Sequence, residues 1–242
     1  MTNFSWIIFI VVLGVILILI STYFKNNNLY KTYEEDVECA VGLLDDEEIP
    51  ESEVLFQDLI LAMKEIAPEI NVSLNPGASE EDIQKLQDAT GVYIPHLFTM
   101  IYSVHNGQKP ASTPFYFTEE WLSIDHIIEV WEMMHQLWLD KKFQHPDGTP
   151  WAVQADPEIR NDWWNPNWLP ITHDGAGNYL CMDLDHTDLR SYGQIILFER
   201  DNGSRTLIAA SLTHLFQMYL DDLRSGELFY SDDYGGIVEK WE

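Results

Sequence analysis

The chain has 242 residues, 46% of them hydrophobic, and is long enough to bury a full core in one main domain. Its 13 basic and 40 acidic residues give a formal net charge of −27, which argues against binding to a nucleic-acid backbone or to an anionic membrane surface. The charge favours a basic partner, although solubility alone would also account for it. The two cysteines, Cys39 and Cys181, lie far apart and imply neither a disulfide framework nor a zinc site.

The first predicted element is a membrane span. The stretch from Trp6 to Phe24 carries no charged residue, and at about 1.5 Å per residue a helix of this length crosses the hydrocarbon layer. A cleaved signal peptide should begin with basic residues, but none precedes this stretch. We therefore expect an uncleaved transmembrane helix over residues 5–24 in a single-pass protein of the cell membrane. Lys25 and Lys31 follow the span and favour a cytoplasmic location for the rest of the chain.

An acidic tether is predicted next, over residues 25–53. Ten of the chain's acidic residues lie between Glu34 and Glu53, and no Lys or Arg occurs among them. We expect the folded domain to cover residues 54–226 and a C-terminal tail to cover residues 227–242.

The first half of this domain is predicted to be mainly helical. Apolar residues recur at helical spacing from Val54 to Ile66, and Pro68 ends that pattern. Ser79 is a predicted N-cap of a helix that ends at Gly91. Further expected elements are a helix that starts at Pro95, a short strand over residues 115–117, and a helix capped by Ser123 or Asp125 whose apolar stripe includes Trp131 and Trp138.

The second half is predicted to contain the sheet. Residues 174–178 read D-G-A-G-N and indicate a tight turn, because glycine permits positive φ and Asp and Asn side chains bond to nearby backbone. Strands are expected from Tyr179 to Leu184 and from Gln194 to Phe198. The tryptophan-rich residues 151–167 are expected to form a loop over this sheet, and Ser211 is a predicted cap of the last helix.

Four segments, in this order, resemble the SUKH superfamily, the broad family of the yeast regulator of cell-wall synthesis and killer-toxin resistance. They run from Pro76 to Gly91, from Ile94 to Gly107, from Trp168 through the D-G-A-G-N turn, and from Ser211 to Leu223. The resemblance implies an α+β fold, a single domain whose central, mostly antiparallel β-sheet is flanked by helices. Most members lack a membrane span, so the resemblance does not determine localisation.

Catalytic motifs are missing from the sequence. It contains no G-x-S-x-G elbow, no G-x-x-x-x-G-K-[ST] phosphate loop and no H-E-x-x-H helix. A group of His, Asp and Asn side chains around the turn suits a divalent metal by residue type: His173, Asp174, Asn178, Asp183, Asp185 and His186. A structural turn beside a solvent-facing strand is the better interpretation, so we predict no enzyme activity, cofactor or metal. In that interpretation Asp174, Gly175, Gly177 and Asn178 build the turn.

Partner binding is the predicted role of the exposed loops. Candidate residues are Asp147, Trp163, Trp164, Asp183 and Asp185, since tryptophan often anchors protein interfaces, although core burial is an alternative for each tryptophan. The resemblance implies two functions. The first is an immunity protein that binds and neutralises a cognate polymorphic toxin, where the acidic body would attract a basic toxin. The alternative is a scaffold or regulator of cell-envelope or cell-wall synthesis.

Overall fold

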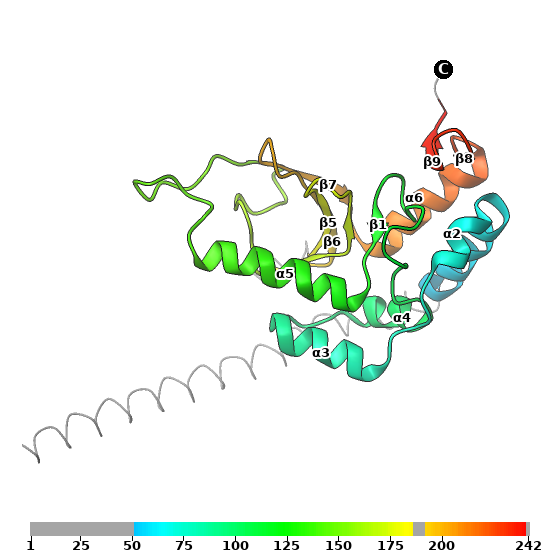
Figure 1. Cartoon of the computed structure of the whole chain (residues 1–242), viewed down its shortest axis with the longest axis horizontal. Coiled ribbons are helices and arrows are strands. Elements are labelled where there is room, and N and C mark those ends of the chain that lie inside the picture. Colours follow the sequence, from blue (N-terminus) through cyan, green and yellow to red (C-terminus); the bar gives the residue numbers. More distant parts are fainter. Residues whose placement is uncertain (1–50, 186–191, 241–242) are drawn as a thin grey trace, which may run out of the picture. The chain divides into compact units, whose positions relative to one another are not determined.

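The computed structural model describes residues 51–185 and 192–240 (Figure 1). The predicted transmembrane helix over residues 5–24 and almost all of the acidic tether lie outside these ranges. Among the helices of the two described ranges, none is long and apolar enough to cross a bilayer.

Helices dominate the first half of the domain, in agreement with the sequence pattern. Residues 51–66 are helical, followed by α2 (Pro68–Ser73), α3 (Glu80–Thr90) and α4 (His96–Val104). Ser79 caps α3 in a capping box with Asp82, and Gly91 ends it with a φ of 70°. Both predicted ends of α3 are therefore confirmed.

Residues 115–117 differ from the prediction of a strand. They belong to a turn in which Tyr116 pairs only with Glu119, and Phe117 has a φ of 52°. The reason is the buried side chain of Gln108, whose Oε1 accepts hydrogen bonds from the backbone N–H groups of Phe115 (2.8 Å) and Trp121 (2.9 Å). Because of these bonds, the backbone at Phe115 pairs with a side chain and not with a neighbouring strand.

The central sheet has five strands in the order β2-β7-β6-β5-β3. Its strands are β2 (Gln154–Ala155), β3 (Trp168–Pro170), β5 (Tyr179–Asp183), β6 (Gln194–Phe198) and β7 (Ser204–Ala209). All neighbouring pairs are antiparallel except the short parallel pair β2–β7, so the expected α+β fold with a mostly antiparallel sheet is present. A separate pair joins β1 (Glu120–Trp121) to β4 (Thr172–His173).

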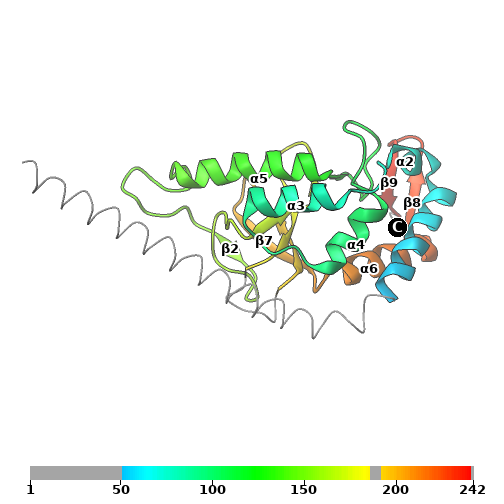
Figure 2. The same ribbon diagram turned by 90° about the horizontal axis from the view of Figure 1, so that it is seen from below.

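Both faces of this sheet are covered. In β5, Leu180 and Met182 join the main core with the helices, whereas Tyr179 and Cys181 join a second apolar cluster. That second cluster also contains Trp131 of α5 (Ile124–Leu139), Trp164 of the loop before β3, and Trp168 of β3 itself. Figures 1 and 2 show α3 and α5 running side by side, in agreement with their contacts. Strand β5 is consequently buried along its whole length.

The C-terminal part comprises α6 (Leu212–Ser225) and a hairpin of β8 (Leu228–Ser231) and β9 (Gly236–Glu239). Ser211 caps α6 as predicted, and its side chain accepts from the backbone N–H of His214. Phe216 of α6 stacks on Phe56 of the first described helix, with ring centroids 5.3 Å apart. The hairpin lies within the segment that the sequence analysis described as a tail.

Gly77 lies where the chain before α3 meets the end of α4. A Cβ at this position would stand 1.8 Å from the carbonyl oxygen of Ser103, which is backbone and cannot rotate away. We therefore predict that Gly77→Ala lowers the free energy of unfolding by about 2–4 kcal/mol. Urea denaturation of the purified chain measures this change.

Gly148→Ala is the matched control, because a Cβ there meets nothing within 4 Å and only the positive φ of 85° opposes the change. We expect this variant to lose about 1 kcal/mol. Equal losses for the two variants would contradict the close approach at Gly77.

Candidate functional site

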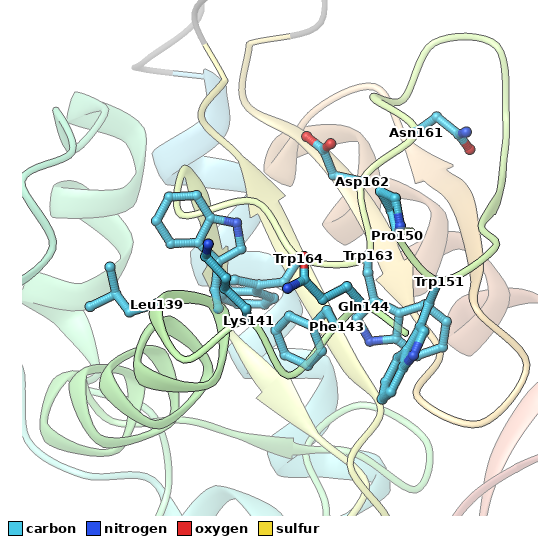
Figure 3. Close-up of a pocket in the computed structure, with 11 residues that line it drawn as sticks. Leu139, Lys141, Phe143, Gln144, Pro150, Trp151, Asn161, Asp162, Trp163 and Trp164 are labelled. Carbon is cyan, nitrogen blue, oxygen red and sulfur yellow. The ribbon is translucent and has the colours of Figure 1, made fainter. Parts of the chain in front are cut away.

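Two adjoining cavities lie beside the loop that follows α5, and they share the side chains of Phe143, Trp151 and Trp163. Figure 3 shows the residues that line the first of them. Their volumes are about 510 Å³ and about 540 Å³, within the range of ligand pockets. We call them together the aromatic groove. The first cavity is also lined by Trp138, Lys141, Gln144, Asn161, Asp162 and Trp164. The second is also lined by Met133, Lys142, Tyr179, Phe198, Arg200 and Asp201.

Two of the three pairs of shared rings meet at steep angles, whereas Phe143 and Trp163 are closer to parallel, at 29° with centroids 6.4 Å apart. Trp151 lies edge-on to Trp163, with centroids 4.8 Å apart and an interplanar angle of 83°, and Phe143 meets Trp151 at 64°. Edge-to-face contacts of this kind are favourable because the positive ring edge faces the negative ring face. At the rim of the groove Trp138 is 44% exposed and Trp151 is 36% exposed. The groove therefore combines an ordered aromatic wall with accessible tryptophan surface.

A polar turn brings the two sides of this wall together. The side chain of Asp147 accepts a hydrogen bond from the backbone N–H of Thr149 (2.9 Å), and Gly148 follows with positive φ. The backbone N–H of Trp151 then donates to the carbonyl of Phe143 (3.1 Å), which aligns these two residues. Asp147, an exposed candidate for partner binding, thus also shapes the groove.

Arg205 attaches the tryptophan-rich loop to the sheet. It is fully buried in β7, directly opposite Phe198, and its guanidinium lies 3.8 Å from the Phe198 ring centroid and 5.3 Å from that of Trp163. It also donates hydrogen bonds to the backbone carbonyls of Glu199 and Trp163. Burial lowers the pKa of Arg205 to about 10, so the group remains cationic at neutral pH. Ring and backbone of Trp163 are held by the same cation.

The two candidate tryptophans have different positions. Trp163 is half-buried and belongs to both cavities, as a partner-binding residue would. Trp164 lines the first cavity but is only 2% exposed, and it packs edge-on against Phe198 in the second core cluster. Both lie in a loop over the sheet, where the sequence placed them.

Asp183 and Asp185 were expected on a solvent-facing side of the strand, and the structure corrects this. They are 4% and 6% exposed, because the tryptophan-rich loop covers that face of the sheet. Asp183 accepts hydrogen bonds from Gln194 Nε2 and from the backbone N–H of Asp185, both at 3.0 Å. Asp185 accepts from Asn165 Nδ2 (2.6 Å) and pairs with Arg160 (3.1 Å). These carboxylates connect the loop to β5 and do not form an exposed patch.

The D-G-A-G-N turn has the geometry that its sequence indicates. Asp174 Oδ1 accepts from the backbone N–H groups of Ala176, Gly177 and Asn178 at 2.8–3.1 Å, and Asn178 Nδ2 donates to Asp174 Oδ2 (2.6 Å). Burial would raise the pKa of Asp174, but these hydrogen bonds hold it below its usual value. Gly175 and Gly177 both have positive φ. In the described residues no group of three metal-ligating side chains could hold an ion.

Glu119 is a half-buried carboxyl that sequence reasoning did not single out. It accepts a hydrogen bond from the hydroxyl of Thr172, which in turn accepts from the backbone N–H of Leu180 (3.0 Å). Burial raises the pKa of Glu119 to about 7, and the nearby Asp174 charge adds to this, while the Thr172 bond opposes it. The cavity that Thr172 lines has a volume of only about 20 Å³, and Glu119 is not part of its lining.

Arg205 and Phe143 also went unnoticed in the sequence. The available signal was a charged residue within a strand, S-R-T-L-I-A, that runs beside a loop rich in tryptophan. Sequence alone does not show that the guanidinium stacks on those rings.

Residues 77–218 match the SMI1 / KNR4 family (SUKH-1). This range includes the residues of the aromatic groove. Similar curated proteins include the glucan synthesis regulatory protein of Neurospora crassa, 26% identical over 197 residues, and the cell wall assembly regulator SMI1 of Saccharomyces cerevisiae, 21% identical over 201 residues. Each match covers 69% of this chain, but 37% and 39% of the two relatives. The chain thus spans less than two-fifths of their length.

Replacement of Arg205 tests the attachment of the loop. Arg205→Met keeps much of the side-chain volume but leaves the carbonyls of Trp163 and Glu199 without their donor, so we predict a loss of about 2 kcal/mol in unfolding free energy. We also expect faster amide hydrogen exchange over residues 143–164. Exposed Arg224, paired with Asp58, is the control, and Arg224→Met should cost no more than about 1 kcal/mol. An Arg205→Met chain with unchanged stability and exchange would contradict this role.

Glu119 should make stability depend on pH. Because its pKa rises from 4.5 to about 7 on folding, the folded chain binds more protons between these values. The contribution of Glu119 to the free energy of unfolding is fully present below about pH 4.5 and is lost as pH rises through about 7. This contribution has an upper limit of about 3 kcal/mol. Burial also raises the pKa of Asp183, to about 6. Asp183 therefore adds a further loss of stability as pH rises.

Urea denaturation at pH 5 and pH 8 checks this dependence. Glu119→Gln should reduce the difference in stability between the two pH values, because the substituted amide does not ionise. The exposed Glu132→Gln serves as a charge-matched control and should leave the difference unchanged. If both variants keep the native pH dependence, Glu119 is not its source.

Proposed function

Because the chain belongs to the SMI1 / KNR4 family (SUKH-1), we propose that it is a protein-binding regulator of cell-wall synthesis. The observation that carries the proposal is the family match over residues 77–218, whose relatives are named as regulators of glucan synthesis or of cell-wall assembly. A third relative, from Schizosaccharomyces pombe, is named a cell wall biosynthesis and cell cycle regulator and is 23% identical over 189 residues.

The aromatic groove is the surface through which we propose that the regulator binds. Trp138 and Trp151 are exposed at its rim, and tryptophan is enriched among the residues that dominate binding energy at protein interfaces. Trp163 of the wall is held by Arg205, which favours a preformed surface that a partner would not have to order. The net charge of −27 would speed encounter with a basic partner.

The regulator is better supported than the immunity protein. The three relatives named above are described by cell-wall or glucan synthesis, and none of their names refers to a toxin. We also propose that the chain acts without catalysis, since Asp183, Asp185 and Glu119 are engaged in hydrogen bonds that support the fold. In this proposal the predicted span over residues 5–24 anchors the domain at the cell membrane, with the domain on the cytoplasmic side.

Deletion of the gene in the native cells tests this function. We expect less cell-wall glucan and greater sensitivity to wall-damaging dyes, and the wild-type chain should restore both. A chain with Trp138→Ala and Trp151→Ala should be expressed at the same level but should not restore them, because it lacks the rim of the groove.

Phe229→Ala is the matched control, since Phe229 is 43% exposed but lies on the β8–β9 hairpin outside the groove. It should restore the wall fully. Unchanged glucan after deletion would refute the regulator, and a new sensitivity to a secreted toxin instead would favour the immunity protein.

A further inference from the structure

The ring arrangement of the aromatic groove restricts what it can bind. Flat stacking of a sugar needs a broad ring face, but Trp151 and Trp163 meet at 83° and partly cover each other. Steeply inclined rings instead leave slots between them. Proline rings are compact and apolar, and aromatic-lined grooves are the surfaces on which proline-rich segments dock.

The two cavities adjoin and share the lining side chains of Phe143, Trp151 and Trp163. A polyproline II helix has three residues per turn and a rise of about 3.1 Å per residue, so prolines three positions apart project from the same side at a spacing of roughly 9 Å. Two adjoining slots that share these side chains suit such a pair. The ligand would straddle the wall with one proline in each cavity.

Polar side chains in the first cavity fit the backbone of such a ligand. The polyproline II helix makes no internal hydrogen bonds, so its carbonyl oxygens are free acceptors. Gln144, Asn161 and Lys141 line this cavity and carry N–H donors. The groove therefore offers donors next to its rings.

The charges of the groove differ from those of the whole chain. The first cavity holds Lys141 and Asp162, and the second holds Lys142, Arg200 and Asp201, so the lining is close to neutral. The chain as a whole has a net charge of −27. The near-neutral lining suits the uncharged middle part of a ligand. Basic residues on either side of that part would be attracted by the negative potential of the acidic chain.

We propose that the aromatic groove binds a proline-rich segment of a partner protein, in the polyproline II conformation and flanked by basic residues. This rests on the protein-binding function proposed above and assigns the chemical class of the partner. The exposed ring of Trp151 separates the two proline positions, and the donors of the first cavity bind backbone carbonyls.

A fluorescent peptide of sequence RPLPPLPR, titrated with the full-length chain in mild detergent, tests the proposal by fluorescence anisotropy. We expect saturable binding that weakens with added salt, because the flanking arginines contribute through screened charge. The peptide RALAALAR, with the same charge and no proline, should bind at least about tenfold more weakly.

Variants of the chain locate the binding site. Trp151→Ala should weaken binding at least about tenfold, and Trp138→Ala should weaken it as well. Tyr234→Ala, a change at a 78% exposed aromatic residue between β8 and β9, should bind like the wild-type chain. Thermal unfolding of each variant, recorded in the same buffer, separates lost binding from lost folding, and the helix residue Trp138 provides a second readout if Trp151→Ala is unstable.

Three outcomes would overturn the proposal: no binding of the proline peptide, equal binding by wild type and both groove variants, or binding of a β-linked glucan oligosaccharide in its place. Failure here is distinguishable from failure of the regulatory function. If the peptide does not bind but the groove variants still fail to restore the cell wall, the ligand class is wrong and the regulator remains.

Discussion

The buried guanidinium of Arg205 connects the tryptophan-rich loop to the sheet. A charge without solvent is costly unless polar or aromatic groups replace the water. Here Phe198 and Trp163 offer ring faces, and the carbonyls of Glu199 and Trp163 accept its hydrogen bonds. Arg205 adds this side-chain attachment to the backbone pairing of β2 with β7, and together they hold the loop, and with it the aromatic groove, beside β7.

Both faces of the sheet are covered, and this coverage also buries carboxylates. The loop that forms the groove also encloses Asp183 and Asp185, which bind Gln194, Asn165 and Arg160 instead of solvent. Polar groups that are buried in this way must be paired, and their pairing holds the loop at its other end. The groove is consequently supported by a cation on one side and by a carboxylate network on the other, and its wall can be preformed before a partner arrives.

Features set by local chemistry could be predicted from the sequence. The capping box at Ser79, the cap at Ser211 and the D-G-A-G-N turn depend on residues a few positions apart, and all three are present. The burial of Asp183 depends on a loop that lies before it in the chain and folds over its strand, which alternation along the strand does not reveal. Similarly, the strand expected at residues 115–117 is absent because the buried side chain of Gln108, seven residues earlier, accepts a hydrogen bond from the backbone N–H of Phe115. The groove itself required tertiary contacts, although the density of tryptophan indicated the right region.

The most direct test of the central claim, that partners bind in the aromatic groove, is site-specific photocrosslinking in native cells. A photoreactive amino acid would replace Leu139, which is 53% exposed and lines the first cavity, or Leu61, which is 59% exposed on the first described helix and lines neither cavity of the groove. We predict that position 139 crosslinks to a cell-wall synthesis protein within a proline-rich segment, and that position 61 does not. Crosslinking of such a protein from position 61 alone would contradict the account.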